Sequence, residues 1–310
     1  MVLLSSLEVC LEDAFMYSIL AIGYYLTFTI LDFPDLSVEG TVLSGGVTFA
    51  VLSAMGVNAY LAMLAAFIVG CLAGSVTGIL HVKLHIRPLL CGILVSTALI
   101  TVNLIAAVVG NGGGFNGDGG LSTVTVTRSA PAVYRSLPFS LLPENVSQMN
   151  LRKLAAFFCC ALVVKILVDL YLKTKSGLLL FATGNNEQFT TMLGKDPGSS
   201  KILGLALGNG LAALSGALIA QSRGNANQGM GLGMVVIGLA SVIIGLSVFR
   251  RVRFLKPTTM VIFGSIIYQA TLGIAALLGV PSAYNKLIMA IIFTIALVVS
   301  GKLTLKKKEA

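Results

Sequence analysis

Long apolar runs separated by short polar segments dominate the chain. The runs are about 18 to 23 residues long, enough for a helix to cross a hydrocarbon core of roughly 30 Å. They do not alternate apolar and polar residues with a period of two, which excludes a membrane β-barrel. We therefore expect an all-α polytopic membrane protein with about eight to ten transmembrane helices. The predicted spans lie near residues 13–31, 41–56, 58–80, 88–109, 152–173, 201–220, 234–249, 258–279 and 285–301.

The spans fall into two groups within one transmembrane domain, residues 1–310. The groups, residues 13–109 and 151–301, flank a Gly-, Ser- and Pro-rich segment, residues 110–150, which is typical of a long loop that is at least partly ordered. The first 15 residues lack a basic region and a small-residue cleavage site, so we expect them to be retained, in a form compatible with a short interfacial helix. A basic tail, residues 302–310, ends the chain.

Composition and charge agree with this interpretation. Of the 310 residues, 56% are hydrophobic and only 11% are charged, and the mean hydropathy is +0.94. The net charge is +9, and fourteen of the 21 Lys and Arg residues lie in His81–Arg87, Lys173–Lys201, Arg250–Lys256 and the tail. By the positive-inside rule these segments and the C-terminus are cytoplasmic. The basic balance therefore needs no nucleic acid to explain it.

The N-terminal end allows two interpretations. Asp32, Asp35 and Glu39 lie between two spans that have almost no gap. Strict counting places the N-terminus outside. Alternatively, the Gly-rich second span is short or broken partway through the membrane, which irregular backbone tolerates only when it is buried in protein or lines a cavity. Residues 38–56 and 227–245 are both Gly-rich entries into spans of opposite direction, the pattern of an inverted repeat.

Small residues recur every four positions on two spans and predict close helix packing. They are Gly70, Gly74 and Gly78 on one span, and Gly204, Gly208, Ala212 and Gly216 on the other. The packing partner could lie within the chain or in a second copy. Embedded charge is nearly absent, except for Lys165 and Asp169, one helical turn apart, which we interpret as a structural ion pair.

Several enzyme classes find no support. The chain has no HExxH motif and no Walker A motif, so it cannot cradle ATP phosphates by itself. His81 and His85 lie in a basic loop, where anchoring at the membrane edge is more common than metal binding. The five cysteines show no metal spacing and read as small apolar residues. We therefore expect no catalytic residue, no metal site and no cofactor in this chain.

One short segment, residues 181–196, is polar within an otherwise apolar chain. Asn185 or Asn186 can cap a helix that begins with Glu187, and Gly194 can end it in the left-handed conformation. About two turns long, it is too short to be stable without packing against something else. Its apolar residues share one face, as expected for a knob that docks into a soluble partner, although an interfacial helix is the alternative. They are Phe189, Met192 and Leu193.

The run "FATGNNEQFTTMLGKDPGSSKILGLALGNGLAALSGALIAQ", residues 181–221, resembles the cytoplasmic loop and following helix of a family of membrane permeases. These permeases belong to binding-protein-dependent ATP-binding cassette (ABC) importers of the branched-chain amino acid and ribose type. The stretch "ILDFPDLSVEGTVLSGG", residues 30–46, is similar to the subfamily associated with aromatic amino acids such as tryptophan and tyrosine. Phe181 stands where the family commonly has a basic residue, so no anchoring role is carried to it.

The resemblance implies a non-catalytic permease subunit in a bacterial cell membrane. Its short loop helix, residues 185–194, would be the coupling helix, with Asn185, Asn186, Glu187 and Gly194 framing the three apolar residues. Two copies of a separate ATPase would bind this helix and hold the ATP and Mg. A solute-binding protein would deliver an amino acid or similar small solute from outside, and a second permease copy would complete a homodimer.

Polar residues at the outer ends and within the spans are candidates for the translocation path. They are Asn103, Asn209, Gln221, Asn225 and Asn227, joined by Asp35 and Glu39 if the second span is broken. For Asn103 a helix-to-helix hydrogen bond is the competing interpretation. The competing function is an ion-coupled secondary transporter or channel that uses Lys165 and Asp169.

Overall fold

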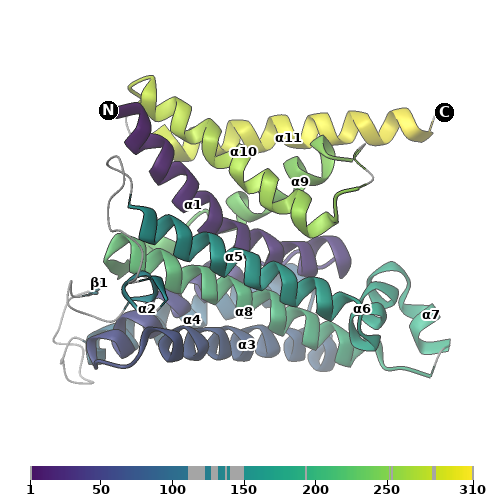
Figure 1. Cartoon of the computed structure of the whole chain (residues 1–310). Coiled ribbons are helices and arrows are strands. Elements are labelled where there is room, and N and C mark those ends of the chain that lie inside the picture. Colours follow the sequence, from purple (N-terminus) through teal and green to yellow (C-terminus); the bar gives the residue numbers. More distant parts are fainter. Residues whose placement is uncertain are drawn as a thin grey trace.

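The computed structural model describes residues 2–110, 123–126, 132–136, 138–139, 150–192, 194–250, 252, 254–280 and 284–308. Helices and short helical turns make up nearly all of the described chain (Figure 1). The α-helices are α1 (Val2–Tyr24), α2 (Val38–Ala54), α3 (Ala59–Leu84), α4 (Pro88–Gly110), α5 (Leu151–Leu172), α6 (Lys175–Asn185), α7 (Glu187–Met192), α8 (Pro197–Arg223), α9 (Met234–Val248), α10 (Pro257–Leu277) and α11 (Asn285–Lys308). The smaller elements are the π-helical turn η1 (Tyr25–Ile30), the 3-10 turns η2 (Val133–Arg135) and η4 (Gln228–Gly231), and the strands β1 (Thr123–Thr125) and β2 (Asn225–Asn227).

Every predicted apolar span corresponds to a helix. In the described part of the chain, 7 helices are long and apolar enough to cross a membrane, and shorter apolar helices cover Val38–Ala54 and Leu287–Val298. The membrane class is therefore confirmed. Two details differ: α1 is continuous from Val2, so a separate interfacial helix at the N-terminus is wrong, and α11 continues as a helix to Lys308 through most of the predicted tail.

The bundle has two distinct ends (Figure 1). Helices α6 and α7 form one end, here called the α7 end, where the C-terminus also lies. The N-terminus lies at the opposite end, where β1 pairs antiparallel with β2 and places Val124 opposite Ala226. We call it the β-ribbon end. The strands are a small exception to the all-α expectation, and they attach part of segment 110–150 to the end of α8.

Helices α1 and α8 form the centre of the bundle. In both, 72% of the most apolar window is buried, against 22% to 44% in the other long spans, whose apolar faces remain available to lipid. Local chemistry sets the limits of α8. The Asp196 side chain accepts hydrogen bonds from the first turn and Pro197 occupies the first helical position, while Gly224 ends the helix with a φ of 71°.

Both stripes of small residues pack within the chain. A Cβ atom on Gly74 would lie 2.2 Å from the carbonyl oxygen of Leu205, so α3 lies directly against α8. On another face of α8, a Cβ on Gly216 would lie 2.0 Å from the carbonyl oxygen of Val42 in α2. Side chains at these positions would push the helices apart, which confirms the packing interpretation and locates both partners.

The second span is short but unbroken. The irregular backbone, residues 31–37, comes before α2, and alternate residues in it are deeply buried: Phe33, Asp35 and Ser37 are at most 3% exposed, whereas Asp32 is exposed. Helix α9 also begins after an irregular stretch, and the backbone N–H of Gly233 donates to the Glu39 carboxylate at 3.0 Å. Two short helices thus begin beside each other inside the bundle, α2 leading toward the β-ribbon end and α9 toward the α7 end (Figure 1). This arrangement supports the inverted repeat.

Candidate functional site

The short polar helix predicted from the sequence is present as α7. Asn186, rather than Asn185, caps it: the Asn186 side-chain oxygen accepts hydrogen bonds from the N–H groups of Gln188 at 3.0 Å and Phe189 at 3.2 Å. Asn185 is the last residue of α6. Gly194 follows α7 with a φ of 68°, the left-handed conformation expected at the end of a helix.

The chain holds α7 by contacts on one side and exposes it on the other. Glu187 forms an ion pair with Lys201 on α8, and Thr190 is fully buried. Phe189 is 53% exposed and Met192 is 83% exposed. Leu193, the third residue of the predicted apolar face, lies outside the described residues. The apolar side chains of α7 thus project from a helix that is itself anchored to α8.

A hollow of about 890 Å³ lies beside this exposed face. Its walls come from the end of η1 and from α6 and α7, with Ile30 and Asp32 on one side and Phe181, Asn185 and Phe189 on the other. Exposed aromatic side chains around a hollow at one end of a bundle form a surface into which another protein can insert.

The predicted path residue Asn209 lies in a buried polar network in the middle of α8. Its amide nitrogen donates to the Asp35 carboxylate at 2.6 Å, and its amide oxygen accepts from Thr41 at 2.8 Å and lies 3.2 Å from the hydroxyl oxygen of Ser37. Ser37 donates to Asp35 through its hydroxyl at 2.6 Å and its N–H at 2.8 Å. The network joins α8 to the irregular backbone before α2. Its buried polar side chains find their hydrogen-bond partners in one another.

The other candidate path residues are spread over several places. Asn103 donates to a backbone carbonyl of α2 at 3.2 Å, which is the helix-to-helix bond considered above. The Gln221 oxygen accepts from a backbone N–H of η2 at 2.9 Å. Asn225 and Asn227 lie on β2 and bond to each other at 3.1 Å. The structure does not bring these residues into one cavity, and their role in a translocation path stays a prediction.

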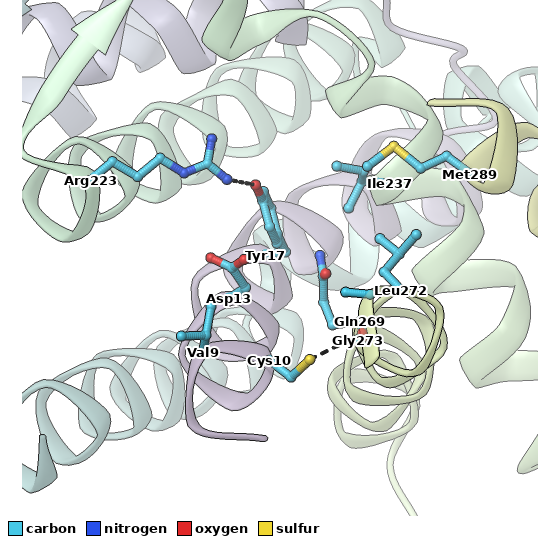
Figure 2. A pocket seen from close by; sticks show the side chains of 11 residues that line it. Val9, Cys10, Asp13, Tyr17, Arg223, Ile237, Gln269, Leu272, Gly273 and Met289 are labelled. Atoms are coloured by element: carbon cyan, nitrogen blue, oxygen red, sulfur yellow. Dashed lines mark hydrogen bonds between the residues drawn. The ribbon is translucent and has the colours of Figure 1, made fainter. Parts of the chain in front are cut away.

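A different set of polar residues does converge on a cavity near the β-ribbon end. The cavity has a volume of about 430 Å³ and lies among α1, the end of α8, α9, α10 and α11. Figure 2 shows Arg223 reaching across it to donate a hydrogen bond to the hydroxyl of Tyr17, at 2.8 Å, with Asp13 below them. Gln269 lies at the opposite wall. Most of the remaining lining is apolar, so the cavity resembles a small-molecule pocket in size and composition.

The sequence interpretation missed these four residues for a simple reason. Asp13 and Arg223 lie at or just beyond the predicted limits of two spans, residues 13–31 and 201–220, where charged residues are ordinary. The sequence offered no signal that singles them out, because only the structure shows that both lie at the outer ends of the helices that the bundle buries most deeply.

Lys165 and Asp169 form the predicted ion pair, with 3.1 Å between the amino and carboxylate groups. The Asp169 carboxylate also contacts Lys256 at 3.0 Å and accepts a hydrogen bond from Thr258 at 2.5 Å. This cluster ties α5 to the start of α10 at the α7 end. A carboxylate bound by two cations and a hydroxyl is suited to a structural role, since it holds the two helices together.

Comparison with known proteins identifies the family to which this membrane bundle belongs. A family model described as "Branched-chain amino acid transport system / permease component" matches residues 6–297. The chain belongs to this permease family.

Two curated relatives cover nearly the whole permease. The tyrosine transport system permease protein of Clostridioides difficile is 39% identical over 299 residues, spanning 96% of this chain and 92% of that protein. An uncharacterized protein of Rickettsia prowazekii is 29% identical over 294 residues, spanning 93% and 95%. No solved structure matches the permease.

Proposed function

We propose that this permease is the transmembrane subunit of an ABC importer and that α7 is the helix through which a separate ATPase moves it. The observation that carries the proposal is the geometry of α7: the Glu187–Lys201 ion pair attaches it to α8 and Thr190 is buried, while Phe189 and Met192 are exposed. A helix that is anchored on one side and apolar on the free side can transmit a push to the span behind it.

The same proposal gives the protein its partners and its orientation. Two ATPase copies, which bind the ATP and Mg, dock at the α7 end, and a solute-binding protein docks at the β-ribbon end. A second permease copy forms a homodimer. The α7 end with its C-terminus is cytoplasmic, because the basic segments near Lys83, Arg87, Lys173 and Lys256 connect helices at this end. The membrane is the cell membrane of a bacterium.

The proposed substrate is an amino acid, with aromatic amino acids first. The relative named as a tyrosine transport permease supports this choice, because it shares 39% identity along almost the full length. The family description supports branched-chain amino acids as the next group to test. The ion-coupled alternative rests on Lys165 and Asp169, but their cluster with Lys256 and Thr258 has the partners of a structural tie.

Reconstitution in proteoliposomes tests the proposal. The permease is co-purified with its cognate ATPase, and uptake of L-tyrosine delivered by its binding protein is measured with ATP, with a non-hydrolysable ATP analogue, and with a proton or sodium gradient alone. We expect uptake with ATP only. Uptake driven by an ion gradient without ATP would refute the ABC assignment and favour the secondary transporter.

A further inference from the structure

The cavity at the β-ribbon end holds two opposite charges, Asp13 and Arg223, which attract each other but form no direct hydrogen bond or ion pair in the described chain. Arg223 donates one hydrogen bond, to Tyr17, and its guanidinium carries five N–H groups in all. In the part of the chain that the structure describes, the Asp13 carboxylate has no hydrogen-bond or ion-pair partner. Both groups face the cavity (Figure 2). A ligand that carries one positive and one negative group would satisfy both.

A third polar group points to a ligand independently. Gln269 is only 5% exposed, and its side-chain nitrogen has no hydrogen-bond partner within the described chain. Buried donors are almost always satisfied, so one that lines a cavity is a place where a ligand acceptor fits. The Cys10 thiol donates to the backbone oxygen of Gln269 at 3.6 Å, which connects α10 to the wall formed by α1.

The rest of the cavity is suited to an apolar side chain. Val9, Ile237, Leu272 and Met289 line it from α1, α9, α10 and α11. The methionine and the aliphatic residues can adapt to aromatic or branched groups. Arg223 itself is exposed, so the charged end of the cavity is reachable from the β-ribbon end.

We infer that this cavity binds a free amino acid as a zwitterion, with Arg223 holding the α-carboxylate, Asp13 holding the α-ammonium and Gln269 donating a further hydrogen bond. The apolar wall receives the side chain. The substrate class rests on the proposed function, and the assignment of these residues goes beyond it. The site lies where a docked binding protein would release its cargo, and the bound amino acid would bridge α1, α8 and α10.

Cys10 provides a direct test, because it lines the same cavity. In a full-length variant whose other cysteines, Cys71, Cys91, Cys159 and Cys160, are replaced by serine, the rate at which Cys10 reacts with a small methanethiosulfonate reagent is measured in proteoliposomes. The probes are L-tyrosine, L-leucine, tyramine, which lacks the carboxylate, and 3-(4-hydroxyphenyl)propionate, which lacks the ammonium group. We expect at least one amino acid to protect Cys10, and each single-charge analogue to protect about 10- to 100-fold more weakly.

Two variants separate the charges. Arg223→Gln should weaken protection by the amino acid about 10- to 100-fold and leave protection by tyramine, which has no carboxylate, unchanged. Asp13→Asn should weaken protection by the amino acid to a similar extent and leave protection by the propionate analogue, which has no ammonium group, unchanged. Lys83→Gln, an exposed basic residue far from the cavity, is the matched control and should change nothing. The selective pattern distinguishes loss of a ligand contact from a misfolded variant.

The inference is overturned if no amino acid protects Cys10, or if both variants bind all four compounds as the parent does. ATP-driven uptake is measured on the same proteoliposomes. Protection without ATP-driven uptake would refute the proposed function and retain the site, whereas uptake without protection would retain the function and refute the site.

Discussion

Removing the exposed apolar face of α7 should separate the permease from its ATPase. The informative change is Phe189→Ala, because the Phe189 side chain is 53% exposed in the permease alone. The Asn186 cap accepts from the backbone N–H of residue 189, which alanine keeps. The backbone of α7 should therefore persist in the variant, and only the contact surface should be lost.

The expected size follows from the exposed area. A phenylalanine side chain buries roughly 150–250 Å² when it is fully enclosed, so the exposed half of Phe189 offers about 100 Å² to a partner. At about 25 cal/mol per Å², covering it contributes about 2.5 kcal/mol to association. Because 1.4 kcal/mol corresponds to a factor of ten, Phe189→Ala should weaken ATPase binding by nearly a hundredfold. Met192→Ala should add to this loss, since Met192 is 83% exposed.

The assay is co-purification of the ATPase with tagged permease, followed by a binding titration of the two purified components. Met55→Ala is the matched control, because Met55 is 74% exposed but lies at the far end of α2. The control should retain full ATPase binding. A Phe189→Ala, Met192→Ala double variant that binds the ATPase as tightly as the parent would refute the role assigned to α7.

Three further predictions concern the bundle that carries α7, and thermal unfolding in detergent checks each of them. Gly74→Ala should destabilise the permease by about 1–3 kcal/mol, because its Cβ would lie 2.2 Å from a carbonyl oxygen of α8. The control Gly229→Ala, whose Cβ would have its nearest contact at 3.4 Å, should be close to neutral. Equal losses of stability in the two variants would contradict this packing. Asn209→Leu should cost about 1–3 kcal/mol because Asp35 loses a buried donor, and an unchanged unfolding temperature would show that the network is dispensable. Hydrogen bonds from the first turn of α8 lower the pKa of the Asp196 carboxyl, so the stability that this cap contributes is present above the ordinary pKa of about 3.9 and is lost as the pH falls below it. Asp196→Ala should therefore lower the unfolding temperature at pH 7 and make less difference near pH 3, and a difference that does not shrink in acid would be inconsistent with the carboxylate as the cap.

Much of the fold could be predicted because its signals are local. A helix that crosses a membrane satisfies its own backbone and needs only a continuous apolar run, so each predicted span is found. The limits of α7 follow from a capping residue and a glycine, which act within one or two turns. The second span was harder, because whether a short span is broken depends on what buries the residues before it.

The sequence by itself determined that this is a multi-pass membrane protein, that a short polar helix follows the fifth long span region, and that the chain resembles a permease. Only the tertiary structure decided which polar residues meet. Asn209 bonds to Asp35, which lies 174 residues away, and Asp13, Arg223 and Gln269 come from three different helices to one cavity. Such meetings depend on how each helix is rotated and which helix lies beside it. Apolar run length carries no information on either, because lipid and protein neighbours are equally apolar.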